Sequence, residues 1–194
     1  MVQELLVKFL KILWIDINSF TYFVKFKIPL ITLNILIGGH MNLNKVKFTE
    51  EHAIEVTNWK YEGKYSIYNL PPWEEIKKKN FSLSKEDKRK NFISFINDNK
   101  ELIGFINLLD EGSYVFFGIG IKPDYCGMGI GKEIISLGLQ ECRNKYSTKP
   151  IILNVRTWNM RAVKCYESQG FKIVETQVQK THLGDGEFFV MRYQ

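Results

Sequence analysis

The fold of this chain is decided by residues 119–132, which read Ile-Gly-Ile-Lys-Pro-Asp-Tyr-Cys-Gly-Met-Gly-Ile-Gly-Lys. An apolar strand is followed by a proline, three alternating glycines and the beginning of an amphipathic helix. Because glycine has no Cβ, this loop can adopt backbone conformations that other residues avoid, and a ligand can approach its main chain closely. The first-turn N–H groups and the dipole of the following helix favour an anion. The stretch therefore predicts a site for a phosphorylated ligand.

Two familiar nucleotide-binding loops do not fit the spacing of these glycines. A dinucleotide-binding fingerprint has its third glycine three residues after its second, where this chain has Lys132, and an acidic residue about 20 positions further on. A P-loop has Ser or Thr after its Gly-Lys pair, but Glu133 follows Lys132, so no hydroxyl is placed for magnesium. An ordinary glycine turn before a helix remains open from this loop alone.

A second segment lies downstream of the glycine loop. Residues 149–157 are apolar and β-branched and predict a strand, and residues 159–170 predict a short helix that ends at Gly170. Four residues of this helix fall at helical spacing on one face: Asn159, Ala162, Val163 and Tyr166.

The glycine loop and the downstream segment together resemble the GNAT superfamily of N-acetyltransferases. The acetyl-CoA loop of that family has the form Arg/Gln-x-x-Gly-x-Gly, and its later helix carries Asn and Tyr. The resemblance covers residues 114–171, and the flanking parts agree with the family in the order of their elements. It implies an α/β (α+β) fold with a mixed, mostly antiparallel central sheet flanked by helices.

The resemblance implies acetyl-CoA as the acetyl donor. The main chain of Ile119 and Ile121 would pair with the pantetheine arm as though the arm were an added strand, and Asn159 would hydrogen-bond the same arm. Cys126 occupies the position at which the family has Arg or Gln, so one usual polar residue of the loop is missing. The implied cofactor-binding residues are Ile119, Gly120, Ile121, Cys126, Gly127, Met128, Gly129, Ile130, Gly131, Lys132 and Asn159.

Within the family, the sequence is most similar to the ribosomal-protein alanine N-acetyltransferases. Their signature runs parallel to this chain from Leu153 to Ser168, but those enzymes have a glutamate general base where this chain has Asn154. An amide cannot accept a proton at neutral pH, so the acceptor substrate cannot be carried over by analogy. The resemblance places Tyr166 near the thioester sulfur, which makes it the candidate catalytic acid.

Acetyl transfer to an amine also needs a proton acceptor, because a free amine with a pKa of about 8 to 10 is mostly protonated at pH 7. Ordered water is one alternative for this role. The other candidates are the ionisable residues that close a predicted strand or lie on the last hairpin: Asp110, Glu111, His182 and Glu187. The amine itself is the nucleophile, so no covalent enzyme intermediate is expected.

The composition predicts a single catalytic domain in a reducing compartment. The chain has 194 residues, of which 45% are apolar and 25% are charged. Its three cysteines form no Cys-x-x-Cys pair, which favours a cytoplasmic location. The three histidines are too scattered for a metal site, and we expect no metal. The net charge of +6 comes from dispersed basic residues, so we expect no nucleic-acid partner.

The order of elements after residue 41 is expected to be β-α-α-β-β-β-α-β-α-β-β, which is the family's usual layout. Strands are predicted at 42–48, 92–97, 102–109, 114–121, 149–157, 172–181 and 187–193, and helices at 49–59, 130–145 and 159–170. The last two strands are expected to form a hairpin around Gly184-Asp185-Gly186.

An aromatic-rich connection runs from Trp59 to Trp73. In the family, the corresponding segment helps to wall the acceptor site, so we expect this stretch to meet the substrate. The alternative is that its aromatic side chains cover the core beneath a long loop.

Residues 1–40 form an apolar N-terminal extension ahead of a domain expected over residues 41–194. Lysines and an aspartate interrupt its apolar stretches, so no membrane span is expected, although an interfacial helix remains open. Gly38-Gly39-His40-Met41 can be encoded by a ribosome-binding sequence followed by a start codon, so residues 1–40 are a candidate for a mis-set gene start.

Two hypotheses of function stay open from the sequence. The first is an acetyl-CoA-dependent N-acetyltransferase that acts on a small-molecule amine or a protein-terminal amine, as a monomer or homodimer. The second is a non-catalytic CoA-sensing or interaction module on the same fold, suggested by Cys126 and Asn154 at two positions where related enzymes have other residues.

Overall fold

A computed structural model describes residues 41–181 and 184–194 of the chain. The residues from Asn42 to Gln194 form one compact unit. The predictions for the extension 1–40 and for His182 lie outside the described residues. In the part of the chain that is described, no helix is both long enough and apolar enough to cross a membrane.

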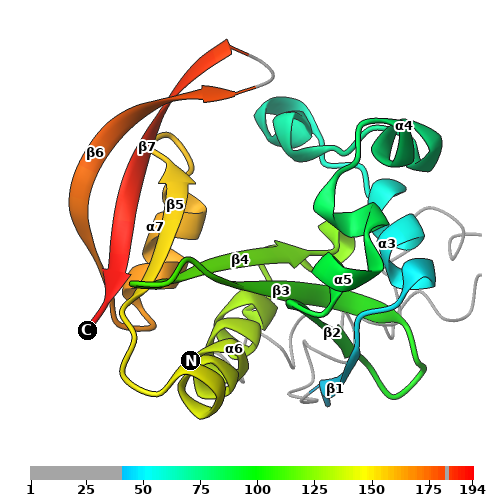
Figure 1. The fold of residues 1–194 in the computed structure, drawn as a ribbon, viewed down its shortest axis with the longest axis horizontal. Helices are drawn as coiled ribbons and strands as arrows, with labels where there is room; N and C mark the ends of the chain where they lie inside the picture. Colours follow the sequence, from blue (N-terminus) through cyan, green and yellow to red (C-terminus); the bar gives the residue numbers. More distant parts are fainter. Residues whose placement is uncertain (1–40, 182–183) are drawn as a thin grey trace, which may run out of the picture. The chain divides into compact units, whose positions relative to one another are not determined.

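A seven-stranded sheet forms the centre of this unit (Figure 1). Its strands lie in the order β1-β2-β3-β4-β5-β7-β6, and every neighbouring pair is antiparallel except β4 and β5. The predicted mixed, mostly antiparallel sheet is therefore confirmed. The strands are β1 Asn44–Lys47, β2 Phe92–Ile96, β3 Leu102–Asp110, β4 Val115–Ile121, β5 Ile151–Arg156, β6 Phe171–Thr181 and β7 Gly184–Tyr193.

The helices follow the expected order, but several short pieces take the place of the single second helix expected between α3 and β2. The helices are α3 Glu50–Thr57, α4 Trp73–Lys78, α5 Glu86–Arg89, α6 Ile130–Tyr146 and α7 Met160–Glu167. There are also three short 3₁₀ segments in the described residues: η1 Gly63–Tyr68 before α4, η2 Ser82–Ser84 before α5 and η3 Pro123–Tyr125 between β4 and α6.

The start of α3 follows from local chemistry. The Thr49 side chain accepts a hydrogen bond from the His52 backbone N–H, and His52 Nδ1 accepts one from the Thr49 backbone N–H. This reciprocal capping box, together with Glu50 and Glu51 in the first turn, stabilises the N-terminus of the helix.

Helices cover both faces of the central strands. On β3, Ile106 points toward α6, because a Cβ on Gly138 of that helix would lie 3.1 Å from Ile106 Cδ1 and 2.8 Å from the Phe117 ring. The neighbouring Phe105 points to the opposite face, where its ring packs 5.7 Å from Phe48 and 5.9 Å from Trp59. The amphipathic helix α6 buries its apolar stripe of Ile134, Ile135, Gly138, Leu139 and Cys142, and Gly138 lets this helix approach the sheet closely.

The sheet opens between its two halves, because β4 and β5 pair only at Val115–Ile151 and Phe116–Ile152. Beyond this point the two strands diverge, and Figure 1 shows β5, β7 and β6 running away from β3 and β4. The predicted hairpin around Gly184-Asp185-Gly186 is displaced: these three residues belong to β7, and Gly184 pairs with Thr181 of β6. Their glycines predict a turn, but the long register between the two strands carries the pairing past them.

Candidate active site

The divergence of β4 and β5 opens a cleft with a volume of about 680 Å³. One wall comes from β4 and the glycine loop, another from α7 and the end of β5, and a third from the aromatic connection before α4. Ten of the predicted site residues line this cleft: Ile119, Gly120, Ile121, Cys126, Gly127, Gly129, Gly131, Lys132, Asn159 and Tyr166. Met128 and Ile130 do not line it, and Ile130 is buried in the core.

The free edge of β4 faces the cleft. Val115 N donates to Pro150 O at 2.8 Å on the β5 side, whereas Lys122 N donates to Ile103 O at 2.9 Å on the β3 side. Successive residues of a strand point their backbone groups to alternate sides, so the odd-numbered residues of β4 face β5. Since pairing with β5 ends at Phe116, the backbone groups of Ile119 and Ile121 face the cleft instead of a strand. An extended ligand can pair with them as an added strand.

One of these backbone groups already has partners. Ile121 O accepts a hydrogen bond from the Tyr61 hydroxyl at 2.8 Å and a weak one from Cys126 Sγ at 3.7 Å. Burial raises the pKa of Tyr61 well above its ordinary value, so the hydroxyl stays protonated and remains a donor. Tyr61 thereby fixes the connection before α4 to the end of β4.

Two of the three glycines in the glycine loop adopt the backbone conformation that other residues avoid, as the sequence predicts. Gly127 and Gly129 both have φ of +85°, and a Cβ at either position would point into open space. The left-handed conformation alone therefore requires glycine at these two positions. Gly131 instead lies in the first turn of α6, where a Cβ would lie 3.4 Å from Cys165 Sγ of α7.

The first turn of α6 supplies backbone donors at the end of this loop. Gly129 is the N-cap and offers no side-chain hydrogen bond, and Lys132 N bonds back to Gly129 O at 2.9 Å. The N–H groups of Ile130 and Gly131 precede the first intrahelical bonds. Together with the nearby Lys132 side chain, they fit the pyrophosphate of a coenzyme A-like ligand.

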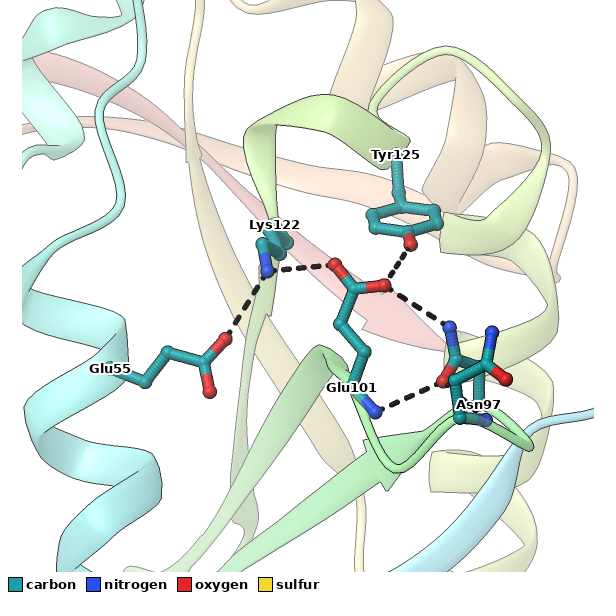
Figure 2. A network of polar contacts seen from close by, with 6 residues as sticks. Glu55, Asn97, Glu101, Lys122 and Tyr125 are labelled. Atoms are coloured by element: carbon teal, nitrogen blue, oxygen red, sulfur yellow. Dashed lines mark hydrogen bonds and ion pairs between the residues drawn. The ribbon is translucent and has the colours of Figure 1, made fainter. Parts of the chain in front are cut away.

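A polar network anchors the stem of the glycine loop (Figure 2). Glu101 accepts hydrogen bonds from the buried Tyr125 hydroxyl at 2.5 Å, from Lys122 Nζ at 2.8 Å and from Asn97 Nδ2 at 3.2 Å. Lys122 also reaches Glu55 of α3 at 3.3 Å. Burial opposes the charge on Glu101, but the hydrogen bonds from Lys122 and Tyr125 outweigh it and lower its pKa. The network holds the residue directly before Cys126 in one position.

Asn159 joins α7 to the aromatic connection. Its Oδ1 accepts a hydrogen bond from Ala162 N at 3.3 Å and caps the helix, and asparagine is among the residues that helix N-caps favour most. Its Nδ2 donates to the Tyr68 hydroxyl at 3.0 Å. Burial raises the pKa of Tyr68, and the hydrogen bond from Asn159 opposes this rise only in part.

Tyr166 lies on α7 and lines the cleft with its ring packed 5.9 Å from Phe171. Its hydroxyl makes no hydrogen bond with any residue that the structure describes. Burial, and then the neighbouring Cys165, raise the pKa of Tyr166 well above its ordinary value. The side chain is therefore a protonated hydroxyl beside the cleft, free to donate to a ligand.

The described candidates for the general base do not line the cleft. Asp110 is paired with Lys149 at 2.6 Å, and Glu187 accepts from Thr157 Oγ1 at 2.9 Å. Glu111 lies in the turn before β4, outside the cleft. Asn154, at the position where related enzymes have a glutamate, does line it.

The aromatic connection divides between cleft and core. Trp59, Tyr61 and Tyr68 line the cleft, whereas Trp73 packs against the core on the α3 side. The sequence did not predict that the ring of Trp158, two residues after the end of β5, lies 6.0 Å from the ring of Tyr68 between centroids. This contact depends on the way the connection folds back over the end of β5.

Two arginines in the cleft were also missed. Arg156 ends β5, and Arg161 in α7 lies 4.3 Å over the Tyr65 ring. Arg161 also lines a smaller adjoining pocket of about 310 Å³ with Tyr61, Tyr65 and Cys126. Both arginines lie within residues 153–168, the stretch that resembles the signature of the ribosomal-protein alanine N-acetyltransferases, but the resemblance was not used to assign them a role.

Comparisons with known proteins agree with this geometry. Residues 52–171 match the model of the "Acetyltransferase (GNAT) family". The mycothiol acetyltransferase of Corynebacterium glutamicum is 30% identical over 88 residues, which are 44% of this chain and 30% of that protein. The N-alpha-acetyltransferase of Sulfurisphaera tokodaii is 30% identical over 88 residues, covering 43% of this chain and 52% of that protein. The chain thus spans less than two thirds of the length of these relatives.

Solved structures share the fold. A chimera of the spermidine N-acetyltransferase SpeG from Vibrio cholerae superposes with a TM-score of 0.65 at 20% identity, over 78% of this chain and 94% of that chain. The ribosomal-protein-S18-alanine N-acetyltransferase from Escherichia coli superposes with a TM-score of 0.57 at 17% identity, over 78% and 93%. The match over residues 52–171, more than half of the chain, shows that the chain belongs to the acetyltransferase (GNAT) family.

Proposed function

We propose that this chain is an N-acetyltransferase that moves the acetyl group of acetyl-CoA to a primary amine. The free edge of β4 at Ile119 and Ile121, directly beside the glycine loop, is the observation that carries the proposal. This strand edge can pair with an extended ligand. It runs from the N-terminus of α6, which can bind an anion, into the cleft. A pantetheine arm with a pyrophosphate at one end has matching chemistry.

The reaction proceeds by direct attack while both substrates are bound. The neutral amine attacks the thioester carbonyl, the C–N bond forms, and the C–S bond breaks as the tetrahedral intermediate collapses. Tyr166 donates its proton to the leaving sulfur, because its raised pKa keeps the hydroxyl protonated. No carboxylate of the described residues lines the cleft, so we propose that water accepts the proton of the amine.

The three cysteines of the chain are free thiols: Cys126, Cys142 and Cys165. Burial raises the pKa of Cys126, with Arg161 opposing the rise, which favours its thiol form. Cys126 therefore serves as part of the loop and not as a nucleophile. Free thiols are typical of reducing compartments, so we place the protein in the cytoplasm.

The alternative function is a CoA-sensing module without catalysis, motivated by Cys126 and Asn154 in the cleft. Thiol release from acetyl-CoA in the presence of a broad panel of primary amines separates the two functions. Catalysis predicts release with at least one amine, and we expect Tyr166→Phe to lower kcat by about 100-fold or more. Binding of acetyl-CoA without release by the unaltered chain would support the sensing module.

A further inference from the structure

The charged side chains that line the cleft are all basic. They are Lys132, Arg156, Arg161 and Lys164. No Asp or Glu from the described ranges 41–181 and 184–194 lines it. Glu62 and Asp124 line the smaller adjoining pocket, beside Lys60 and Arg161. Within the cleft itself a polycationic acceptor would meet like charges, which disfavours its binding there.

Three of these basic residues lie near the proposed coenzyme site. Lys132 belongs to the first turn of α6, and Lys164 precedes Cys165, whose sulfur lies beside Gly131 of that turn. Arg161 shares the smaller pocket with Cys126 of the glycine loop. The phosphates of the donor can account for these charges, but Arg156 stands apart on β5.

Arg156 is held in a defined position. Its guanidinium lies 4.8 Å over the ring of Phe188, its register partner on β7, and Nη2 is 3.5 Å from Thr181 Oγ1. A Cβ at Gly186 would collide with Arg156 Nη1, so the glycine makes room for the guanidinium. A larger residue at position 186 would require the guanidinium to shift.

No acidic residue among those described pairs with Arg156. The acidic residue closest to Arg156 on the neighbouring strand is Glu187 of β7. Arg156 lies opposite Phe188, and Thr157 N donates to Glu187 O, so Glu187 lies opposite the next residue along. Because side chains alternate between the faces of a sheet, Glu187 lies on the opposite face from Arg156. Its carboxylate is bonded to Thr157 Oγ1 there.

A half-buried guanidinium without an anion is unfavourable, because burial removes water that would solvate its charge. Its planar fork matches carboxylate and phosphate groups, which it binds with charge-assisted hydrogen bonds. Arg156 shares the lining of the cleft with Tyr68, whose hydroxyl bonds Asn159, and with Tyr166. Its charge opposes the rise in the pKa of Tyr68 that burial causes.

We infer that the acceptor is a small primary amine that also carries an anionic group, and that Arg156 binds this group. The inference rests on the proposed acetyl transfer and names the class of its acceptor. The cleft of about 680 Å³ must hold the pantetheine arm as well, which leaves room for a small acceptor. Carboxylate and phosphate share the required chemistry, and the experiment separates them.

Four amines of similar length test the inference: β-alanine, 2-aminoethyl phosphate, propylamine and 1,3-diaminopropane. Acetylation of any of these amines supports the proposed function. The ranking of their kcat/KM values tests the inference about the acceptor. We expect kcat/KM for β-alanine or 2-aminoethyl phosphate to exceed that for propylamine by about 10- to 100-fold, with the diamine lowest. The better of the two anionic amines identifies the carboxylate or the phosphate as the recognised group.

Variants assign the effect to Arg156. Arg156→Gln should raise KM for the anionic amine by about 10- to 100-fold and leave KM for propylamine and acetyl-CoA unchanged. Arg156→Glu should make the diamine the best acceptor, a gain that a misfolded protein cannot give. Arg192→Gln is the matched control, since Arg192 is exposed on β7 outside the cleft.

Three outcomes would overturn the inference. The first is that kcat/KM of the unaltered chain for the diamine or for propylamine equals that for the anionic amines, which leaves the proposed function standing. Arg156→Gln raises KM for acetyl-CoA, which assigns Arg156 to the donor. None of the four amines is acetylated although another amine of the broad panel is, which leaves the proposed function standing; if no amine of the panel is acetylated, the proposed function is contradicted as well.

Discussion

Asn159 donates a hydrogen bond from Nδ2 to the Tyr68 hydroxyl at 3.0 Å, and these two residues are 91 positions apart in the chain. The same side chain caps α7 through Oδ1. One asparagine thus fixes the start of the helix that carries Tyr166 and ties it to the aromatic wall of the cleft. The family resemblance assigns Asn159 to the pantetheine arm, so a ligand would meet a residue that is already oriented.

Replacing Asn159 should therefore destabilise the protein. Asn159→Ala removes the cap and the bond to Tyr68, and we expect the free energy of unfolding to fall by about 1–2 kcal/mol. Asn159→Asp keeps the capping oxygen and should lose less. Urea denaturation measures both, and an alanine variant as stable as the parent would contradict the bridging role.

Alanine at Gly129 should impair donor binding as well as stability. The φ of +85° makes a side chain unfavourable by about 1–2 kcal/mol, although a Cβ would contact nothing. Gly112 offers a matched control, because it has φ of +79° in open space at an exposed turn outside the cleft. We expect a similar loss of stability in both variants and a raised KM for acetyl-CoA only in Gly129→Ala. If the two variants had the same KM for acetyl-CoA, the glycine loop would not be part of the donor site.

Glu101 should make stability depend on pH in the acid range. Its pKa is lower in the folded protein than its ordinary value, so its stabilising effect is complete above about pH 5 and is lost as the pH falls through the folded pKa. Glu101→Gln should therefore be less stable than the parent near neutral pH, and the difference should shrink on acidification. Thermal unfolding between about pH 3 and 7 tests this. A difference that stays constant with pH would rule out the ionised network.

The pH dependence of catalysis should reflect the substrate amine. Since no carboxylate or imidazole of the described residues lines the cleft, kcat/KM should rise about tenfold per pH unit up to the pKa of the amine. Tyr166 should cause no decline below about pH 10, because burial raises its pKa above that value. A plateau well below the pKa of the amine would reveal a base in the protein.

Local signals in the sequence predicted the elements that build the donor side of the cleft. The proline and glycines before residue 130 and the apolar stripe after it place α6 within one residue of its observed end at Tyr146. In the same way, Asn159 marks the beginning of α7, and Gly170 marks its end and the beginning of β6. These features depend on neighbouring residues only, and this is why a single sequence reveals them.

The acceptor side could not be predicted in the same way. Arg156 meets Phe188 only because β5 pairs with β7, and Trp158 meets Tyr68 only because the connection folds back over the end of β5. Such contacts depend on register between distant segments. The connection from Trp59 to Trp73 also forms a short 3₁₀ turn whose position is set by Tyr61 and Asn159, not by its own pattern.

The transfer of an acetyl group to an amine nitrogen is the central claim, and one measurement tests it most directly. The chain is incubated with acetyl-CoA and a primary amine, and the amide, free CoA and intact protein are quantified together by mass spectrometry. The account predicts one amide for each CoA released, with no acetyl group retained on the protein. Release of CoA without amide, or bound acetyl-CoA that never turns over with any amine of a broad panel, would contradict it.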